Sequence, residues 1–129
     1  MHELGLVFEV INRVEALAKE NGIQHIQKVV LAIGEISYVV PMFIEEVYAP
    51  ACRGTVLEGS ELVMETIPAR GKCRRCRRAF DIVKFEGACP HCGEKDYEVL
   101  SGDEFLIKEI IVPEDEVPPD SPPYEPDDK

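Results

Sequence analysis

Four of the five cysteines in this 129-residue chain form two Cys-x-x-Cys pairs, which are separated by twelve residues. The short spacing lets both sulfurs of a pair reach one ion, and two facing pairs supply the four thiolates of a tetrahedral zinc site. Four thiolates fill the coordination sphere and leave no position for a reacting water, so the site would be structural. The expected Zn²⁺ ligands are Cys73, Cys76, Cys89 and Cys92.

Three other interpretations of these residues remain open. The pairs could form disulfides or a redox dithiol, but neither has the helix start beside a βαβ unit that is typical of redox pairs. An iron–sulfur cluster is a further alternative, although the spacing is not of the ferredoxin type. His91, inside the second pair, could replace a thiolate, but we expect it to be exposed. Cys52 stands apart and is expected to be a buried, inert apolar residue.

The sequence MHEL at the N-terminus places further metal ligands beside a predicted helix start. A lone histidine near a terminus is usually solvated. However, the terminal amine of Met1, the amide nitrogen of His2 and its imidazole can form fused chelate rings on one ion. Nitrogen ligands in a plane suit Ni²⁺ or Cu²⁺, and Glu3 can add an oxygen or its own amide nitrogen. The positive end of the helix dipole would keep the affinity of this site modest.

The formal charge of −11 argues against a general nucleic-acid binder, because an acidic protein repels phosphate. Six of the fourteen Lys and Arg residues nevertheless surround the first cysteine pair: Arg70, Lys72, Arg74, Arg75, Arg77 and Arg78. The simplest interpretation is that these cations offset the −2 charge of a zinc–thiolate centre and form a solvated face. The alternative function is a zinc-ribbon module that binds an acidic protein or a nucleic acid through four arginines: Arg74, Arg75, Arg77 and Arg78.

Apolar spacing predicts an α+β fold with a three-stranded sheet and two helices. Steps of three and four predict helices over 4–18 and 41–51, the second beginning at a proline. Apolar or alternating β-branched segments predict three strands, over 28–35, 61–67 and 104–112. The connection between the second and third strands is rich in Cys, Gly and basic residues, so it predicts an inserted, zinc-ribbon-like module built on the four paired cysteines.

This pattern divides the chain into three parts. Residues 1–68 and 103–112 form an α/β domain, 69–102 form the inserted zinc module, and 113–129 form an acidic, proline-rich tail that we expect to be disordered. No apolar run approaches the ~20 residues that span a bilayer, and the N-terminus lacks the basic region of a signal peptide. We therefore expect a cytoplasmic protein without membrane contact.

Several of these segments together resemble the HypA/HybF family of hydrogenase-maturation nickel metallochaperones. They are the initial MHE, the helix ending AKENG, the strand VVLAIGEIS, the C-x₂-C-x₁₂-C-x₂-C insertion and the closing SGDEFLIKEI. The resemblance covers about residues 1–112. It implies transient Ni²⁺ at His2, with Met1 and Glu3 nearby, and structural Zn²⁺ at the four paired cysteines. It also implies a GTPase partner, HypB, and delivery of Ni²⁺ to the [NiFe] hydrogenase large subunit or, in some organisms, to urease.

The leading prediction is therefore a nickel carrier and not an enzyme. The sequence contains no P-loop, no Ser–His–Asp arrangement and no paired catalytic carboxylates. A thiol redox protein is the third possibility, and it predicts disulfide formation on mild oxidation. A strand-linked insertion can exchange between chains, so both a monomer and a dimer are compatible with this pattern.

Overall fold

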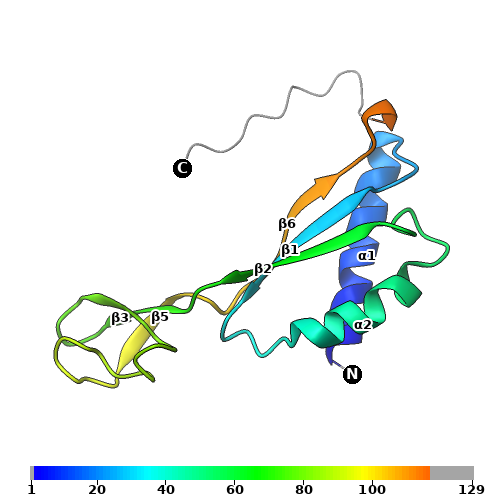
Figure 1. The fold of residues 1–129 in the computed structure, drawn as a ribbon. Coiled ribbons are helices and arrows are strands. Elements are labelled where there is room, and N and C mark those ends of the chain that lie inside the picture. Colours follow the sequence, from blue (N-terminus) through cyan, green and yellow to red (C-terminus); the bar gives the residue numbers. More distant parts are fainter. Residues whose placement is uncertain (1, 117–129) are drawn as a thin grey trace.

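The computed structural model describes residues 2–116 and contains two helices, six strands and one short 3-10 helix. The elements are α1 (His2–Asn21), β1 (Lys28–Gly34), α2 (Pro41–Cys52), β2 (Glu61–Ile67), β3 (Arg70–Cys73), β4 (Ala79–Asp81), β5 (Tyr97–Ser101), β6 (Phe105–Ile111) and η1 (Glu114–Glu116). Figure 1 shows an elongated molecule in which the helices lie at one end and β3 to β5 at the other. The α+β prediction is confirmed, and the helices are somewhat longer than the predicted ranges.

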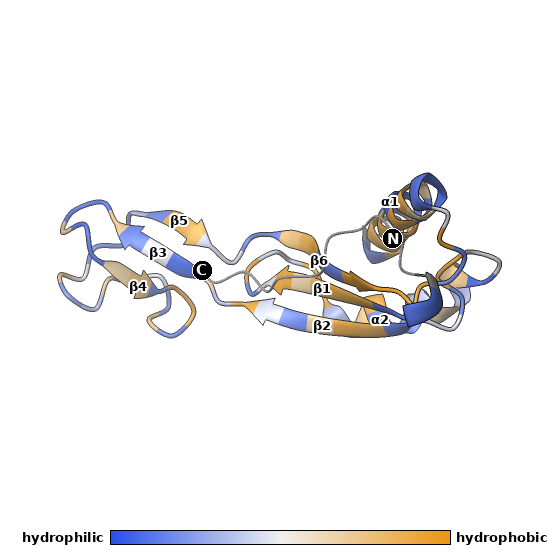
Figure 2. Cartoon of the chain, turned by 90° about the horizontal axis from the view of Figure 1, so that it is seen from above, coloured by the Kyte–Doolittle hydropathy of each residue, from blue (hydrophilic) through white to orange (hydrophobic). Residues whose placement is uncertain are grey.

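The first sheet has the strand order β2-β1-β6, with β1 parallel to β2 and antiparallel to β6. The parallel pairing of β1 and β2 requires a crossover, and α2 lies within it. The central strand β1 is apolar along almost its whole length (Figure 2) and is buried from Val29 to Gly34. A central strand buried on both faces explains why its sequence is a continuous apolar run.

The main core lies between the two helices and one face of this sheet. On β1, the residues Val29, Leu31 and Ile33 contribute to this core and are each at most 3% exposed. α1 and α2 supply most of the other buried side chains, Val7, Val10, Ile11, Val14, Ile44, Tyr48 and Cys52, and the connections add Ile26 and Leu57. The hydroxyl of Tyr48 lies 2.6 Å from that of Ser60, which satisfies the phenol in this apolar setting. Burial raises the pKa of Tyr48, since the charged form would lose its hydration.

The second sheet has the order β4-β3-β5, with both pairings antiparallel. Its separate small core consists of Ala69, Cys73, Phe80, Ile82 and Cys89. Phe80 and Tyr97 stack edge to face with ring centroids 5.6 Å apart. We call residues 69–102 the cysteine module. Two of its five core residues are the predicted metal ligands Cys73 and Cys89, so apolar packing alone gives this module little stability.

Two glycines permit the close contact that joins the two sheets. A Cβ on Gly34 would lie 2.1 Å from the carbonyl oxygen of Gly102, and a Cβ on Gly102 would lie 2.4 Å from Cα of Ala69. Gly102 also has φ +103°, a conformation that side chains rarely adopt. The N–H of Ile36 donates to the Gly102 carbonyl at 2.7 Å, and the Glu35 carboxylate accepts from the N–H of Ala69 at 3.0 Å.

The predicted acidic tail falls mostly outside the described residues. Of its residues, Glu114–Glu116 form the 3-10 helix η1, and 117–129 lie beyond the described part. Val112, just before the predicted tail, packs against the main core. No helix within residues 2–116 is long and apolar enough to cross a membrane.

Candidate metal centre

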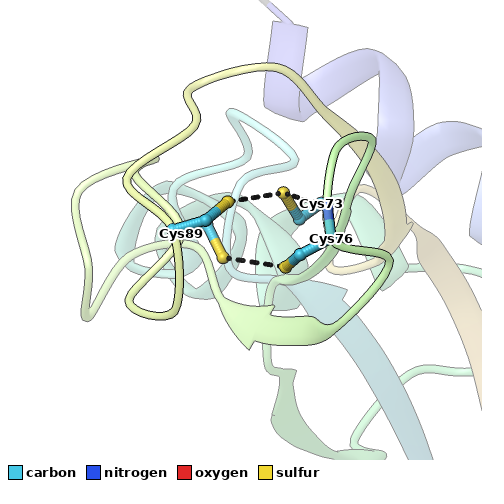
Figure 3. A group of neighbouring side chains, drawn as sticks. Cys73, Cys76 and Cys89 are labelled. Atoms are coloured by element: carbon cyan, nitrogen blue, oxygen red, sulfur yellow. Dashed lines mark hydrogen bonds between the residues drawn. The ribbon is translucent and has the colours of Figure 1, made fainter.

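The four paired cysteines converge at the outer end of the cysteine module, as Figure 3 shows for Cys73, Cys76 and Cys89. Their sulfurs all lie within 4.8 Å of one another, and the side chains that the structure describes form no other such group of three or more His, Cys, Asp or Glu residues. The Cys73–Cys92 and Cys76–Cys89 sulfur distances are 3.5 and 3.6 Å. A tetrahedral zinc ion with Zn–S bonds of about 2.3 Å separates its sulfurs by about 3.8 Å, so the cluster fits zinc.

The two cysteine turns have the same backbone geometry. In the first, the N–H of Arg77 donates to the Cys73 carbonyl at 2.9 Å, and in the second the N–H of Gly93 donates to the Cys89 carbonyl at 2.8 Å. The residue after each pair has positive φ, +68° at Arg77 and +80° at Gly93. Each turn also directs a backbone N–H at a sulfur, from Cys76 to Cys73 and from His91 to Cys89, both at 3.4 Å. Such donors stabilise a thiolate.

The thiols differ in how readily they ionise. The N–H of Cys76 lowers the pKa of Cys73 to about 6 despite the effect of burial. The N–H of Glu94 acts in the same direction on Cys92, but burial and the neighbouring sulfurs raise the pKa of Cys92 to about 11. Within this coupled group of thiols, Cys73 therefore ionises more readily than Cys92. Metal binding at this site would release protons.

The remaining cysteine and the histidine of the second turn lie as the sequence indicates. Cys52 is 1% exposed, far from the cluster in sequence, and burial raises the pKa of its thiol, so it is poorly reactive. His91 is exposed, and Nδ1 of its ring accepts a hydrogen bond from the Arg78 guanidinium at 3.1 Å. All five cysteines are free thiols, with no disulfide among them.

The first cysteine turn has Arg77 at its positive-φ position, whereas the second turn has Gly93 there. Substitutions at these two positions should therefore change the stability of the module in opposite directions. An L side chain in this conformation costs about 1 kcal/mol, whereas glycine adopts it freely. We expect Arg77→Gly to stabilise the cysteine module by about 0.5–1 kcal/mol and Gly93→Ala to destabilise it by a similar amount. Chelator titration of the zinc-loaded variants compares the two. A loss of stability in Arg77→Gly would mean that the arginine side chain makes a compensating contact.

At the other end of the molecule, the structure describes the side chain of only one of the three predicted nickel ligands. Glu3 lies in the first turn of α1 and is 7% exposed. Its Oε2 accepts a hydrogen bond from the N–H of Val40 at 3.3 Å, at the start of α2. The positive ends of two helix dipoles therefore share this carboxylate. The backbone of His2 begins α1, while Met1 and the His2 side chain lie outside the described part.

The contact between Glu3 and Val40 could not be predicted from the sequence, because no pattern near the terminus indicates a hydrogen-bond partner 37 residues away. With Oε2 engaged by the backbone, Oε1 is the oxygen that Glu3 has left for a ligand. The sequence also did not indicate that Glu35 holds the backbone of Ala69, or that Arg77 has positive φ. Glycine follows the second cysteine pair, at position 93, and Arg77 holds the equivalent position after the first pair. This equivalence is the signal that could have indicated the positive φ of Arg77.

Comparison with known proteins relates this architecture to one family. The family model described as "Hydrogenase/urease nickel incorporation, metallochaperone, hypA" matches residues 1–112. The hydrogenase maturation factor HypA of Geobacter metallireducens is 38% identical over 112 residues, which is 87% of this chain and 99% of that protein. The hydrogenase maturation factor HybF of Klebsiella pneumoniae is 32% identical over 110 residues, covering 85% and 97% of the two chains.

The fold agrees with these sequence matches. The solution structure of the Ni metallochaperone HypA from Helicobacter pylori superposes with a TM-score of 0.62 and 21% identity, over 85% of this chain and 96% of that one. With the match across both sheets and relatives above 30% identity over nearly their whole length, the chain belongs to the HypA family of nickel-incorporation metallochaperones.

Proposed function

We propose that this chain binds Ni²⁺ at its N-terminus and delivers it during maturation of the [NiFe] hydrogenase large subunit. The observation that carries the proposal is the family match over residues 1–112, which includes both the initial MHE and the four paired cysteines. In this proposal the chain is a carrier and not an enzyme. It works in the cytoplasm with a HypB-type GTPase, and urease is a second possible acceptor.

The two metals have separate roles in this proposal. Cys73, Cys76, Cys89 and Cys92 would hold Zn²⁺, and the supporting observation is that their sulfurs lie within 4.8 Å of one another. A zinc ion bound by four thiolates is coordinatively full, so it would tie the two cysteine turns together and take no part in nickel transfer. We accordingly propose that residues 1–68 with 103–112 form the nickel-binding domain and 69–102 the zinc-binding module.

Nickel, the cargo, would be held by groups at the start of α1. The Met1 amine and the amide and imidazole nitrogens of His2 suit a planar Ni²⁺ site, and Glu3 would contribute through Oε1. The two helix N-termini that share the Glu3 carboxylate carry partial positive charge, which opposes a nearby cation. This electrostatic opposition supports a site that releases its metal readily. Transfer would then proceed by ligand exchange, in which an acceptor group displaces His2 and protonation of its imidazole favours release.

Replacing His2 by alanine tests the nickel assignment. We expect His2→Ala to lose specific Ni²⁺ binding, because the imidazole closes the chelate, while the zinc content and the fold stay unchanged. His25→Ala is the matched control, since His25 is an exposed histidine outside the proposed site. Calorimetric titration of the zinc-loaded proteins with Ni²⁺ gives the comparison. Equal nickel affinity in the wild type and His2→Ala would rule out the assignment.

The exposed arginines of the first cysteine turn favour a second candidate, a zinc-ribbon module that binds nucleic acid. Arg74, Arg75, Arg77 and Arg78 are all exposed, and Arg74 forms an ion pair with Asp96 at 3.1 Å. Binding to phosphates would weaken steeply with salt. A mobility-shift titration at several salt concentrations, with the arginines intact and replaced, separates the candidates. Salt-dependent binding without a Ni²⁺ site would favour this second candidate.

A further inference from the structure

A cluster of cations lies on the surface of the cysteine module, and none of its members is a proposed ligand of either metal. We call it the basic patch, and it consists of Arg70, Lys72, Arg74, Arg75, Arg77 and Arg78. Burial alternates along β3, so Arg70 and Lys72 lie on its outer face while Gly71 and Cys73 are buried. The four arginines of the first cysteine turn are all exposed.

A small hollow in the basic patch brings three of these cations together. Its volume is about 180 Å³, and it is lined by Lys72, Arg74 and Arg77 beside Cys73. Glu98 also lines the hollow, because Lys72 and Glu98 are paired in register on the neighbouring strands β3 and β5. The lining therefore combines three cations with one carboxylate of the chain itself.

The positive charge of the basic patch is only partly compensated. Of its six cations, only Arg74 forms an ion pair within the described part of the chain, with Asp96 at 3.1 Å. The acids adjacent to the patch are Asp81 on β4, Asp96 just before β5 and Glu98 on β5. Six cations against three acids leave a positive surplus. The surplus remains even after the −2 charge of a zinc–thiolate centre is subtracted.

The backbone of Arg77 gives a second, independent indication. Its φ is +68°, and at the equivalent position of the second turn the chain has Gly93. Residues other than glycine are uncommon in this conformation and cluster at functional sites. Arg77 is exposed and lines the hollow, so its strained position places a guanidinium group where it can meet an anion.

We propose that the basic patch docks an acidic segment of a partner protein, with Arg77 as the anchoring residue. Guanidinium groups bind carboxylates through two parallel hydrogen bonds, and both Arg74 and Arg77 line the hollow. In an extended segment, every second side chain lies on the same face, at a spacing of about 7 Å. Arg70 and Lys72 have this two-residue spacing on β3, so acids at alternate positions of the partner match them.

A nucleic acid fits this surface less well than an acidic segment does. Proteins bind single strands by stacking bases on exposed aromatic side chains, and residues 70–78 contain no aromatic residue. A nucleic-acid strand would also carry its charge past the module, and outside 69–102 the chain has 20 acids against 6 Lys and Arg residues. A short acidic segment confines its charge to the patch.

The basic patch and the start of α1 lie at opposite ends of the elongated molecule (Figure 1). A partner held at the patch would therefore leave the proposed nickel site uncovered. The inference does not rest on nickel binding, because no residue of the patch contributes to that site.

Titration of the zinc-loaded full chain with a synthetic acidic peptide tests this inference. The probe is a peptide of alternating glutamate and glycine, and its matched control has glutamine in place of each glutamate. At physiological ionic strength we expect the glutamate peptide to bind and to shift the amide resonances of residues 70–78. The glutamine peptide should not bind, because it cannot form ion pairs with the arginines.

Three variants separate the role of Arg77 from the fold and from net charge. Arg77→Gly removes the anchor and relieves the positive φ, so zinc content should be retained while peptide binding weakens by about fivefold. Arg77→Lys keeps the charge but loses the planar guanidinium, so it should also weaken binding measurably. Lys84→Ala is the matched control, because Lys84 is an exposed cation of the same module outside the patch, and it should bind as the wild type does.

No binding of the glutamate peptide, or equal binding by the wild type and Arg77→Gly, would overturn the inference. So would equal weakening in Arg77→Gly and Lys84→Ala, which would show that only net charge matters. A single-stranded oligonucleotide that binds more tightly than the peptide at the same salt would assign the patch to nucleic acid instead. The peptide assay needs no nickel and should give the same result in His2→Ala, so its failure is distinguishable from failure of the nickel proposal.

Discussion

Replacing Cys73 by serine is expected to abolish zinc binding and unfold the cysteine module, while α1, α2 and the first sheet stay folded. The module has a core of only five residues, two of which are cysteines of the cluster. Apolar burial of that size cannot offset the conformational entropy of 69–102. The stability of the module must then come largely from metal binding, which contributes of the order of 10 kcal/mol in small zinc domains.

Metal analysis combined with hydrogen exchange measures this effect. Zinc should fall from one per chain to none, and amide protection should disappear from β3, β4 and β5 but persist in β1. Cys52→Ala is the control, because it removes a buried thiol of the main core and leaves the cluster intact. Retained protection in β3 to β5 without zinc would show that the module does not need the metal.

Gly34→Ala is expected to destabilise the whole chain by about 3 kcal/mol or more, a large share of a typical stability of about 5–15 kcal/mol. The added Cβ would lie 2.1 Å from the Gly102 carbonyl oxygen. Neither backbone can move aside easily, because Gly34 donates to Glu104 at 2.7 Å and Gly102 accepts from Ile36 at 2.7 Å. The clash would therefore separate the two sheets or break these hydrogen bonds.

Chemical denaturation of Gly34→Ala and Gly5→Ala provides the comparison. Gly5 lies exposed within α1, and a Cβ there would meet nothing within 4 Å. Alanine at this position should stabilise the helix by about 0.5–1 kcal/mol. Both variants replace glycine by alanine, but the free energy of unfolding should fall in Gly34→Ala and rise in Gly5→Ala. A wild-type unfolding free energy in Gly34→Ala would contradict the close approach at this junction.

The elements of the fold could be predicted because each has a local signature. A continuous apolar run indicated β1, alternating or apolar segments indicated β2 and β6, and apolar spacing with period 3.6 indicated both helices. The patterns are less accurate at the borders of the apolar helix faces. Leu17 and Phe43 fall on the apolar faces that this spacing gives the two helices, but they are 44% and 41% exposed. They lie at the border of the apolar stripes, where a small rotation of the helix decides between core and solvent.

Contacts between distant segments could not be predicted from the sequence. The spacing of the four cysteines indicated their convergence, since two Cys-x-x-Cys pairs commonly bind one metal ion. No comparable signal indicated that Glu3 holds the start of α2, that Glu35 binds the backbone of Ala69, or that Gly34 meets Gly102. These contacts depend on how the two sheets are placed in space, which a single sequence does not encode in any local pattern.

X-ray absorption at the nickel and zinc edges of one doubly loaded sample tests whether the two metals occupy separate sites. We expect one zinc surrounded by four sulfurs and one nickel surrounded only by nitrogen and oxygen. The nickel signal should disappear in His2→Ala and in a chain with one residue added before Met1, because that residue displaces the terminal amine. Sulfur ligands on nickel, or nickel that replaces zinc at Cys73, Cys76, Cys89 and Cys92, would contradict it.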